Sequence, residues 1–183
     1  MKKIALALAV LLLLTLPLAV MTSCGSDDAD TPKEIIEAEI PAGYVAYENG
    51  DIRFAYPESY TKQDGSTVLL IDSTTGNNIT VVYENKTDYY DKMTLEKYEE
   101  EMIPQFEAMG MTITNPSLEH LNNPTTGAAI TKVTHRAVYS GTSMKQTMLV
   151  LTAGKKTYTV TVTEVVGDGN MLNAVINTLG FDK

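Results

Sequence analysis

Short runs of alternating apolar and polar residues, separated by turn dipeptides, fill most of the chain from Tyr44 onward. Such alternation is typical of β-strands with one buried face, and closely spaced turns pair such strands as hairpins. In the first pair, Asn49-Gly50 separates residues 44–48 from residues 52–56, and both turn residues tolerate positive φ. Further strands are expected over residues 67–72, 78–83, 111–114, 117–121, 128–139, 143–152 and 157–166, with turns at Ser140-Gly141 and Gly154-Lys155.

Two segments have helical periodicity instead. Thr94 is expected to cap a helix that continues to Met109 and stops at Gly110, with apolar residues three or four apart. Pro104 lies inside this pattern and lacks an amide donor, so it predicts a kink or an early end. A last helix is expected to start at Asp168 or Asn170 and to end at Gly180, and Phe181 is expected to pack back.

The order of these elements predicts an α+β fold. Strands joined mostly as hairpins form a mainly antiparallel β-sheet, and the two helices bury their apolar stripes against its faces. No internal repeat interrupts this order, so residues 44–183 are interpreted as one globular domain.

The first 24 residues have the layout of a secretory signal. Lys2 and Lys3 precede the apolar residues 4–20, and Met21-Thr22-Ser23 leads to Cys24. This ending resembles the bacterial lipobox, and the resemblance implies cleavage between Ser23 and Cys24 and attachment of a lipid bearing palmitate to Cys24. The alternative is an ordinary signal peptide followed by a free, reactive cysteine.

Charge and cysteine content add three expectations. Cys24 is the only cysteine of the 183-residue chain, so no intramolecular disulfide can form. Residues 24–43 are acidic and poor in large side chains, so we interpret them as a tether between the lipid and the domain. The net charge of −9 disfavours nucleic acid as a partner, because phosphate backbones are repelled by an acidic surface.

The domain resembles the PsbP-like fold, which a photosystem subunit, the Mog-type transport factor, DcrB-type proteins and many small bacterial lipoproteins share. The resemblance is carried by the opening hairpin with Tyr56-Pro57, the helix after Met93-Thr94, the long hairpins of residues 130–166 and the closing Leu179-Gly180-Phe181. It implies an α/β/α sandwich and a binding or assembly role. Tyr60 stands near the position where family members often have tryptophan, and this chain has none.

The sequence contains no recognisable set of catalytic residues. His135 is expected to be a packed sheet residue and His120 a solvated residue near a turn, and neither belongs to a spaced metal-binding pair. The serines lie outside any Gly-x-Ser-x-Gly elbow, and no glycine-rich phosphate loop is present. The acidic clusters around Asp27 and at Asp88 and Asp91 lack the ligand spacing of a calcium loop, so the sequence predicts no metal and no cofactor.

Tyrosine is the more suggestive residue type. The chain has ten tyrosines, and Tyr89-Tyr90 lies in the expected connection between a strand and a helix. Exposed tyrosine offers rigid contact area and a hydroxyl group, so this pair is the candidate partner-binding site, with core packing as the alternative. The alternating threonines at positions 157, 159, 161 and 163 are interpreted as the outer face of a strand.

These observations favour one function and leave two alternatives. The leading hypothesis is a lipid-anchored, extracytoplasmic, non-enzymatic binding or assembly module of the cell envelope with an unknown protein partner. The first alternative is a carrier of a small apolar ligand held by Met102, Phe106, Met109 and Met148, because methionine adapts to varied shapes. The second is an enzyme with an unrecognised site, which a carboxylate beside His135 in an open pocket would favour.

Overall fold

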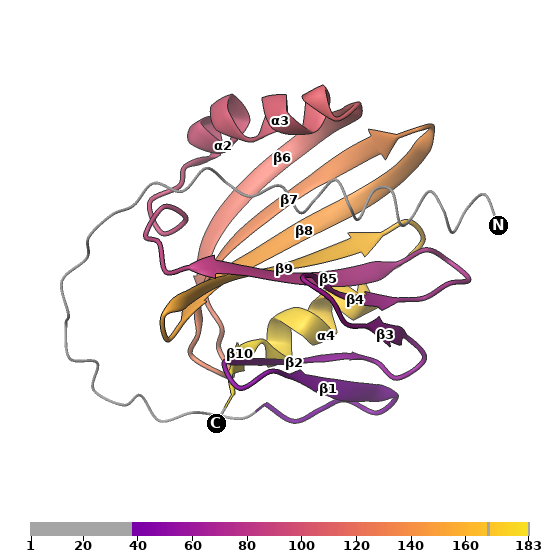
Figure 1. Ribbon diagram of the computed structural model, residues 1–183, viewed down its shortest axis with the longest axis vertical. Helices are drawn as coiled ribbons and strands as arrows, with labels where there is room; N and C mark the ends of the chain where they lie inside the picture. Colours follow the sequence, from indigo (N-terminus) through magenta and orange to yellow (C-terminus); the bar gives the residue numbers. More distant parts are fainter. Residues whose placement is uncertain (1–37, 168, 183) are drawn as a thin grey trace.

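Two antiparallel sheets and three helical segments make up the part of the protein that the computed structural model describes, residues 38–167 and 169–182 (Figure 1). The long sheet has the strand order β3-β4-β5-β9-β8-β7-β6, and the small sheet has the order β1-β2-β10. The elements are β1 (Tyr44–Glu48), β2 (Ile52–Pro57), β3 (Thr61–Gln63), β4 (Val68–Ile71), β5 (Asn78–Asn85), α2 (Leu95–Glu101), α3 (Ile103–Ala108), β6 (Met111–Asn122), β7 (Ala129–Tyr139), β8 (Thr142–Ala153), β9 (Lys156–Glu164), α4 (Asn170–Thr178) and β10 (Gly180–Phe181). The α+β class and the mainly antiparallel pairing are confirmed.

None of the helices within the described ranges has the length and apolar character needed to span a membrane.

The long sheet is built from hairpins whose turns lie where the sequence predicts them. Ser140 and Gly141 connect β7 to β8 with φ values of 49° and 80°, which is the positive-φ pair that a two-residue hairpin turn needs. Gly154 and Lys155 connect β8 to β9 in a second two-residue turn, in which only Gly154 has a positive φ, at 57°, and Ala153 lies opposite Lys156. These two turns therefore set which side chains lie opposite each other across three central strands.

The Asn49-Gly50 turn forms by a different mechanism from the one expected. Only Gly50 has a positive φ, at 84°. The Oδ1 atom of Asn49 instead accepts hydrogen bonds from the amides of Asp51 and Ile52, at 3.1 and 3.0 Å. Asparagine thus stabilises this turn through its side chain, as in an Asx turn.

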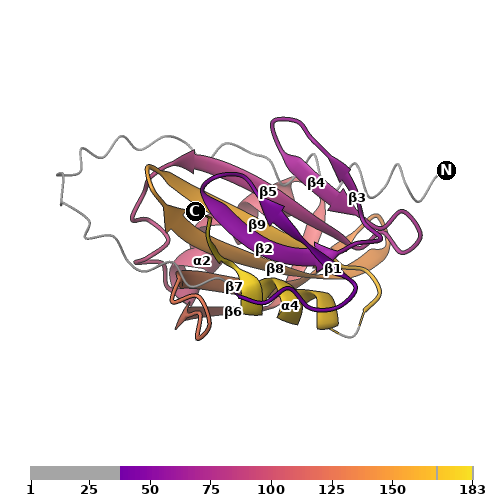
Figure 2. The same ribbon diagram turned by 90° about the horizontal axis from the view of Figure 1, so that it is seen from below.

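α4 and the small sheet cover one face of the long sheet, and α2 and α3 cover the other (Figures 1 and 2), with a hydrophobic core under each. On one face, α4 and the small sheet pack through Phe54 and Val175 against inward side chains such as Leu149 and Val160. On the other face, α2 and α3 pack against a separate cluster. That second cluster comprises Tyr90, Met93, Tyr98, Met102, Phe106, Met111, Val133, Ala137, Met144, Met148 and Val150.

The predicted interruption at Pro104 is confirmed. Thr94 caps α2, because its Oγ1 accepts a hydrogen bond from the Lys97 amide at 3.2 Å. The helix ends at Glu101, and α3 begins at Ile103 with Pro104 in its first turn, where a missing amide donor costs least. Gly110 follows with φ 84° and turns the chain into β6.

The edges of the long sheet differ from the expected pattern. β6 is one strand rather than two, with a register shift between Thr114 and Ser117. Asn115 has φ 52° there, and Pro116 follows, which an edge strand tolerates at a bulge. The strand β3 was not expected, because its three residues are all exposed and carry no apolar pattern.

The C-terminal end also differs. The helix α4 begins after Gly169, at Asn170, and ends at Thr178 rather than at Gly180; Asp168 lies outside the described residues. Gly180 instead starts β10, which pairs with β2 opposite Arg53. A Cβ at Gly180 would lie 2.7 Å from the Cβ of Thr126, so only glycine fits here.

The threonines of β9 line an inner face, so the interpretation of an outer face is wrong. Thr157, Thr161 and Thr163 are 2%, 4% and 1% exposed. They share the sheet face that α2 and α3 pack against, while the intervening tyrosine and valines face the α4 core. A central strand covered on both sides buries both sets of side chains.

Candidate functional site

His135 lies in a chain of buried polar side chains rather than in an open site. It is 1% exposed, and its Nδ1 lies 2.8 Å from the hydroxyl of Tyr98 on α2. Its Nε2 lies 3.1 Å from Oε1 of Gln146 on β8, and Gln146 Nε2 donates to Oγ1 of Thr163 on β9 at 3.3 Å. The expectation that His135 is a packed sheet residue is confirmed.

The partners of His135 determine which nitrogen carries the proton. Because Gln146 donates to Thr163 through its amide nitrogen, its oxygen is the group that faces His135. His135 therefore donates from Nε2, and its Nδ1 accepts from Tyr98. Burial lowers the pKa of His135, and the hydrogen bond to Gln146 raises it by a smaller amount. The pKa therefore lies below its ordinary value, and the ring is neutral at pH 7. Its neighbour is an amide, not the carboxylate that a catalytic interpretation needed.

His120 lies near the end of β6, two residues before Asn122, so the expectation of an exposed residue near a turn is confirmed. Its side chain is exposed, yet both ring nitrogens have partners. Nδ1 lies 3.1 Å from Oγ1 of Thr131, and Nε2 lies 2.9 Å from the carbonyl oxygen of Met93. His120 thus attaches the segment before α2 to the edge of the long sheet.

The tyrosine pair proposed as a partner site, Tyr89 and Tyr90, is largely packed against the rest of the domain. Tyr90 is 7% exposed and packs in the α2–α3 core, and its ring meets that of Tyr89 edge-on at 5.1 Å. Tyr89 is half-buried; its hydroxyl donates to Glu101, and the Lys97 ammonium lies 4.2 Å from its ring centre. Only Tyr89 offers accessible ring surface, and its role in partner binding stays a prediction.

The methionines and phenylalanine suggested for an apolar ligand lie in the same core. Met102, Phe106 and Met148 are 9%, 5% and 8% exposed and pack between the helices and the sheet, with Met109 at the margin. The carrier hypothesis therefore places its ligand among side chains that already fill the interior.

The remaining predicted residues fall in two places. Ser23, Cys24 and the acidic cluster around Asp27 lie outside the described residues. Asp88 is exposed and accepts a hydrogen bond from Lys92. Within the described ranges, no group of three or more histidine, cysteine, aspartate or glutamate side chains is placed to hold a metal ion.

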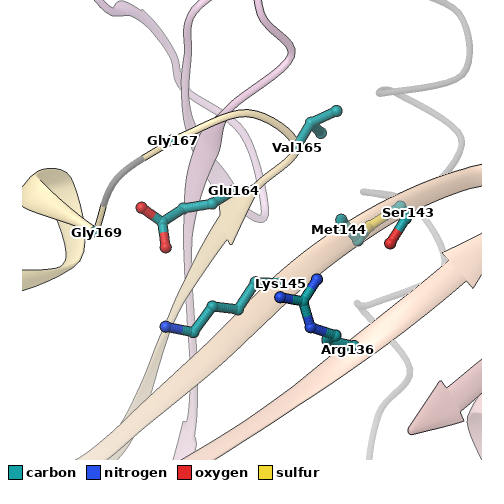
Figure 3. A pocket seen from close by; sticks show the side chains of 8 residues that line it. All are labelled: Arg136, Ser143, Met144, Lys145, Glu164, Val165, Gly167 and Gly169. Atoms are coloured by element: carbon teal, nitrogen blue, oxygen red, sulfur yellow. The ribbon is translucent and has the colours of Figure 1, made fainter.

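A pocket of about 410 Å³ opens where β7, β8 and β9 approach the start of α4 (Figure 3). Arg136 comes from β7, Lys145 from β8 and Glu164 from β9, and the three side chains extend from these neighbouring strands to line the pocket. The other lining residues are Ser143, Met144, Val165, Gly167 and Gly169.

The charged lining follows directly from strand register. Arg136 lies opposite Lys145 across β7 and β8, and Lys145 lies opposite Glu164 across β8 and β9. Directly opposed residues project from the same face of a sheet, so the three side chains form a row of two cations and one anion. This face is the α4 side, at a point that the helix leaves uncovered.

Sequence reasoning missed this row, although the signal was available. The expected turns Ser140-Gly141 and Gly154-Lys155 fix both registers, and counting outward from them pairs residue 136 with 145 and 145 with 164. What the turns cannot predict is that α4 stops short of this part of the sheet.

A second charged cluster joins the small sheet to the long one. The Lys156 ammonium lies 2.8 Å from Oδ2 of Asp51, and the Tyr158 hydroxyl donates to the same oxygen. The hydrogen bonds from Lys156 and then from Tyr158 lower the pKa of Asp51. Lys156 also lies 4.6 Å from the ring centre of Tyr83, which is 60% exposed. Asp51, Lys156 and Tyr158 are thus hydrogen-bonded to one another, and Tyr83 adds a cation–π contact.

Comparison with known proteins gives no family. No protein-family model and no curated protein matches the chain. Among solved structures it is similar to a crystal structure from Bacteroides thetaiotaomicron VPI-5482, with 16% identity and a TM-score of 0.46. That alignment covers 72% of this chain and 45% of the other, so the chain spans less than half the length of that protein.

Proposed function

We propose that this chain is an extracytoplasmic lipoprotein whose globular domain is a non-enzymatic binding module, tethered to a membrane by a lipid on Cys24. The observation that carries the binding role is the open pocket at the ends of β7, β8 and β9. Its charged side chains are mounted on three neighbouring strands of a rigid sheet. Such preorganised polar groups around a concave site are typical of ligand binding.

The roles of the two histidines support binding rather than catalysis. Both ring nitrogens of His135 are used inside the core, and both ring nitrogens of His120 are used to attach the segment before α2. A general base needs a nitrogen or oxygen that can reach the substrate. These side chains instead stabilise the scaffold that presents the pocket.

The layered arrangement supports the finer proposal of a PsbP-like α/β/α sandwich. The helices α2 and α3 cover one face of the long sheet, and α4 covers part of the opposite face. In that fold, the activity resides in surfaces added to the sandwich and not in the sandwich itself. The proposal is therefore a binding module with a site of its own rather than one inherited function.

The first described residues support a tether that ends at the small sheet. Ala38 is 7% exposed, and Arg53 on β2 donates from Nη1 to its carbonyl oxygen at 3.3 Å. Arg53 also pairs with Glu48 at 2.7 Å. The proposed tether, residues 24–43, is thus held against the domain from Ala38 onward.

Replacing Cys24 with serine is expected to abolish the anchor. Without the sulfur, no thioether to a lipid can form, and the membrane affinity supplied by the acyl chains, about 0.8 kcal/mol for each buried CH₂ group, is lost. We expect labelled palmitate to be absent from the variant and the share of mature protein in the membrane fraction to fall at least tenfold. Cell fractionation and metabolic labelling measure both.

Ser23→Ala is the matched control, because it keeps a small residue before the cysteine and leaves the sulfur in place. This variant should be processed and anchored like the unchanged chain. If C24S remained membrane-bound and fully labelled, the lipid would not be on this residue and the proposed anchor would be wrong.

A photo-crosslinking amino acid at position 143 tests the binding role in living cells. Ser143 is exposed and lines the pocket, whereas Thr61 on β3 is exposed and lies on another strand edge. We expect a discrete adduct, identified by mass spectrometry, from position 143 and not from position 61. Equal, non-specific labelling from both positions would contradict a binding site at the pocket.

A further inference from the structure

We propose that the pocket between β7, β8 and β9 binds an oxyanion group, a carboxylate or a phosphate carried by a small ligand, through Arg136 and Lys145. This inference rests on the proposed binding function and names the chemistry of the same site. It depends on three observations: the pairing of two cations, the placement of other cations in the domain, and the position of Glu164.

The first observation is that two cations face each other across neighbouring strands. Arg136 lies opposite Lys145 in the β7–β8 register, and both line the pocket. Like charges at directly opposed positions destabilise a sheet. An oxyanion bound between them would offset this repulsion and accept hydrogen bonds from both side chains. Guanidinium and ammonium groups are the usual partners of carboxylate and phosphate.

The second observation is how the other cations of the domain are paired. In the described part of the chain, six cationic side chains have a carboxylate within 4.0 Å: Arg53, Lys62, Lys92, Lys97, Lys132 and Lys156. Arg136, Lys145, Lys86 and Lys155 have none among the described residues, and of these four only Arg136 and Lys145 line the pocket. An acidic protein that leaves two adjacent cations without an ion-pair partner in a pocket presents a local positive potential.

The third observation is the position of Glu164. It lies opposite Lys145 in the β8–β9 register, yet no ion pair between them comes within 4.0 Å in the described structure. Its carboxylate instead lies against Gly167, where a Cβ would come within 3.2 Å of Oε1. In Figure 3, Glu164 and Lys145 extend from neighbouring strands with open space between their ends. Among the described residues, Glu164 therefore pairs with neither cation, and Arg136 and Lys145 can bind an external anion.

The proposal predicts opposite effects for substitutions within one pocket. R136Q and K145Q each remove a positive charge and should weaken anion binding at least tenfold. E164Q removes the negative charge beside the anion and should strengthen binding two- to fivefold. R136Q should leave the thermal midpoint of the free protein unchanged or slightly raised, because it relieves the repulsion between opposed cations.

Isothermal titration of the full lipidated protein, purified in detergent, measures these effects. The probes are succinate, inorganic phosphate and, as a cationic control, choline chloride, at low ionic strength because salt screens the site. Succinate and phosphate distinguish the two sources of the oxyanion. K155Q is the matched control, since Lys155 is an exposed cation in the turn between β8 and β9, outside the pocket.

Saturable binding of succinate or phosphate that R136Q and K145Q weaken, E164Q strengthens and K155Q leaves unchanged supports the inference. No saturable binding of either anion, or equal weakening by K155Q, overturns it. A crosslink from position 143 with no anion binding would leave the binding module standing and reject only the anion. Failure of both experiments would reject the proposed function as well.

Discussion

His135→Ala is expected to lower the free energy of unfolding by about 4 kcal/mol, because it removes packing contacts and leaves a cavity at a fully buried site. His135 is 1% exposed and packs against Tyr98 and Phe106, whose ring centres lie 6.1 and 5.5 Å from its own. The substitution also leaves the Tyr98 hydroxyl and the Gln146 oxygen without partners, and each unsatisfied buried group costs about 1–3 kcal/mol. Chemical denaturation followed by circular dichroism measures the change.

Val138→Ala is the matched control on the same strand. Val138 is 39% exposed, so its truncation should change the free energy of unfolding by no more than about 0.5 kcal/mol. A small effect of H135A, comparable to that of V138A, would show that the buried chain of hydrogen bonds contributes little to stability.

The pH dependence of stability tests the protonation state of His135. Burial holds its pKa in the folded protein below the value of about 6.5 expected when the chain unfolds. As the pH falls through 6.5, the unfolded state therefore takes up a proton that the folded state does not. The free energy of unfolding then decreases, by at most about 1.4 kcal/mol per pH unit, until the folded pKa is reached.

His135→Gln removes this titration and serves as the reference, because every other group titrates in both proteins. The unfolding free energy of the unchanged chain minus that of H135Q should be constant above pH 7 and should decrease below pH 6.5, by at most about 1 kcal/mol at pH 5.5. A difference that is independent of pH over this range would contradict a neutral, buried His135.

Asn123→Ala is expected to lower the free energy of unfolding by about 3 kcal/mol, because one buried side chain joins two distant parts of the chain. Asn123 is 1% exposed, and its Nδ2 donates to the carbonyl of Leu179 at 3.0 Å and to that of Ile176. Its Oδ1 accepts from the amides of Thr125 and Thr126 at 2.8 and 3.0 Å. The β6–β7 turn thus caps the end of α4, and denaturation of the purified protein measures the loss.

Two further variants separate the contributions of Asn123. Asn122→Ala removes the same side chain one position earlier, at an exposed site, and should have little effect. Asn123→Asp keeps the acceptor for the turn amides but puts an oxygen against the carbonyls of α4, so it should destabilise at least as much as N123A. If N123A behaved like N122A, the turn would not hold the helix in place.

Local chemistry predicted the elements that depend on neighbouring residues alone. Thr94 caps α2, Pro104 interrupts the helix, and Ser140-Gly141 turns the chain, because caps, kinks and two-residue turns are decided within a few residues. Elements without such a signal were missed: β3 has no apolar alternation, and β10 has two residues whose pairing depends on β2.

The candidate site depended on longer-range information. Tyr89 and Tyr90 looked exposed because a connection between elements usually is, yet Tyr90 fills the space between that connection and the sheet. Arg136, Lys145 and Glu164 looked like separate surface charges, and only the paired registers of three strands bring them into one row.

The sequence by itself determined the central hairpin turns and the start and interruption of the helix after Thr94, since each depends on a few adjacent residues. Only the tertiary structure decided which side chains are covered. The threonines of β9 and the His135–Gln146 pair are buried because α2 and α3 cover that face of the sheet, and the pocket is open because α4 covers only part of the other. Burial depends on what packs above a strand, and that comes from segments far away in the chain.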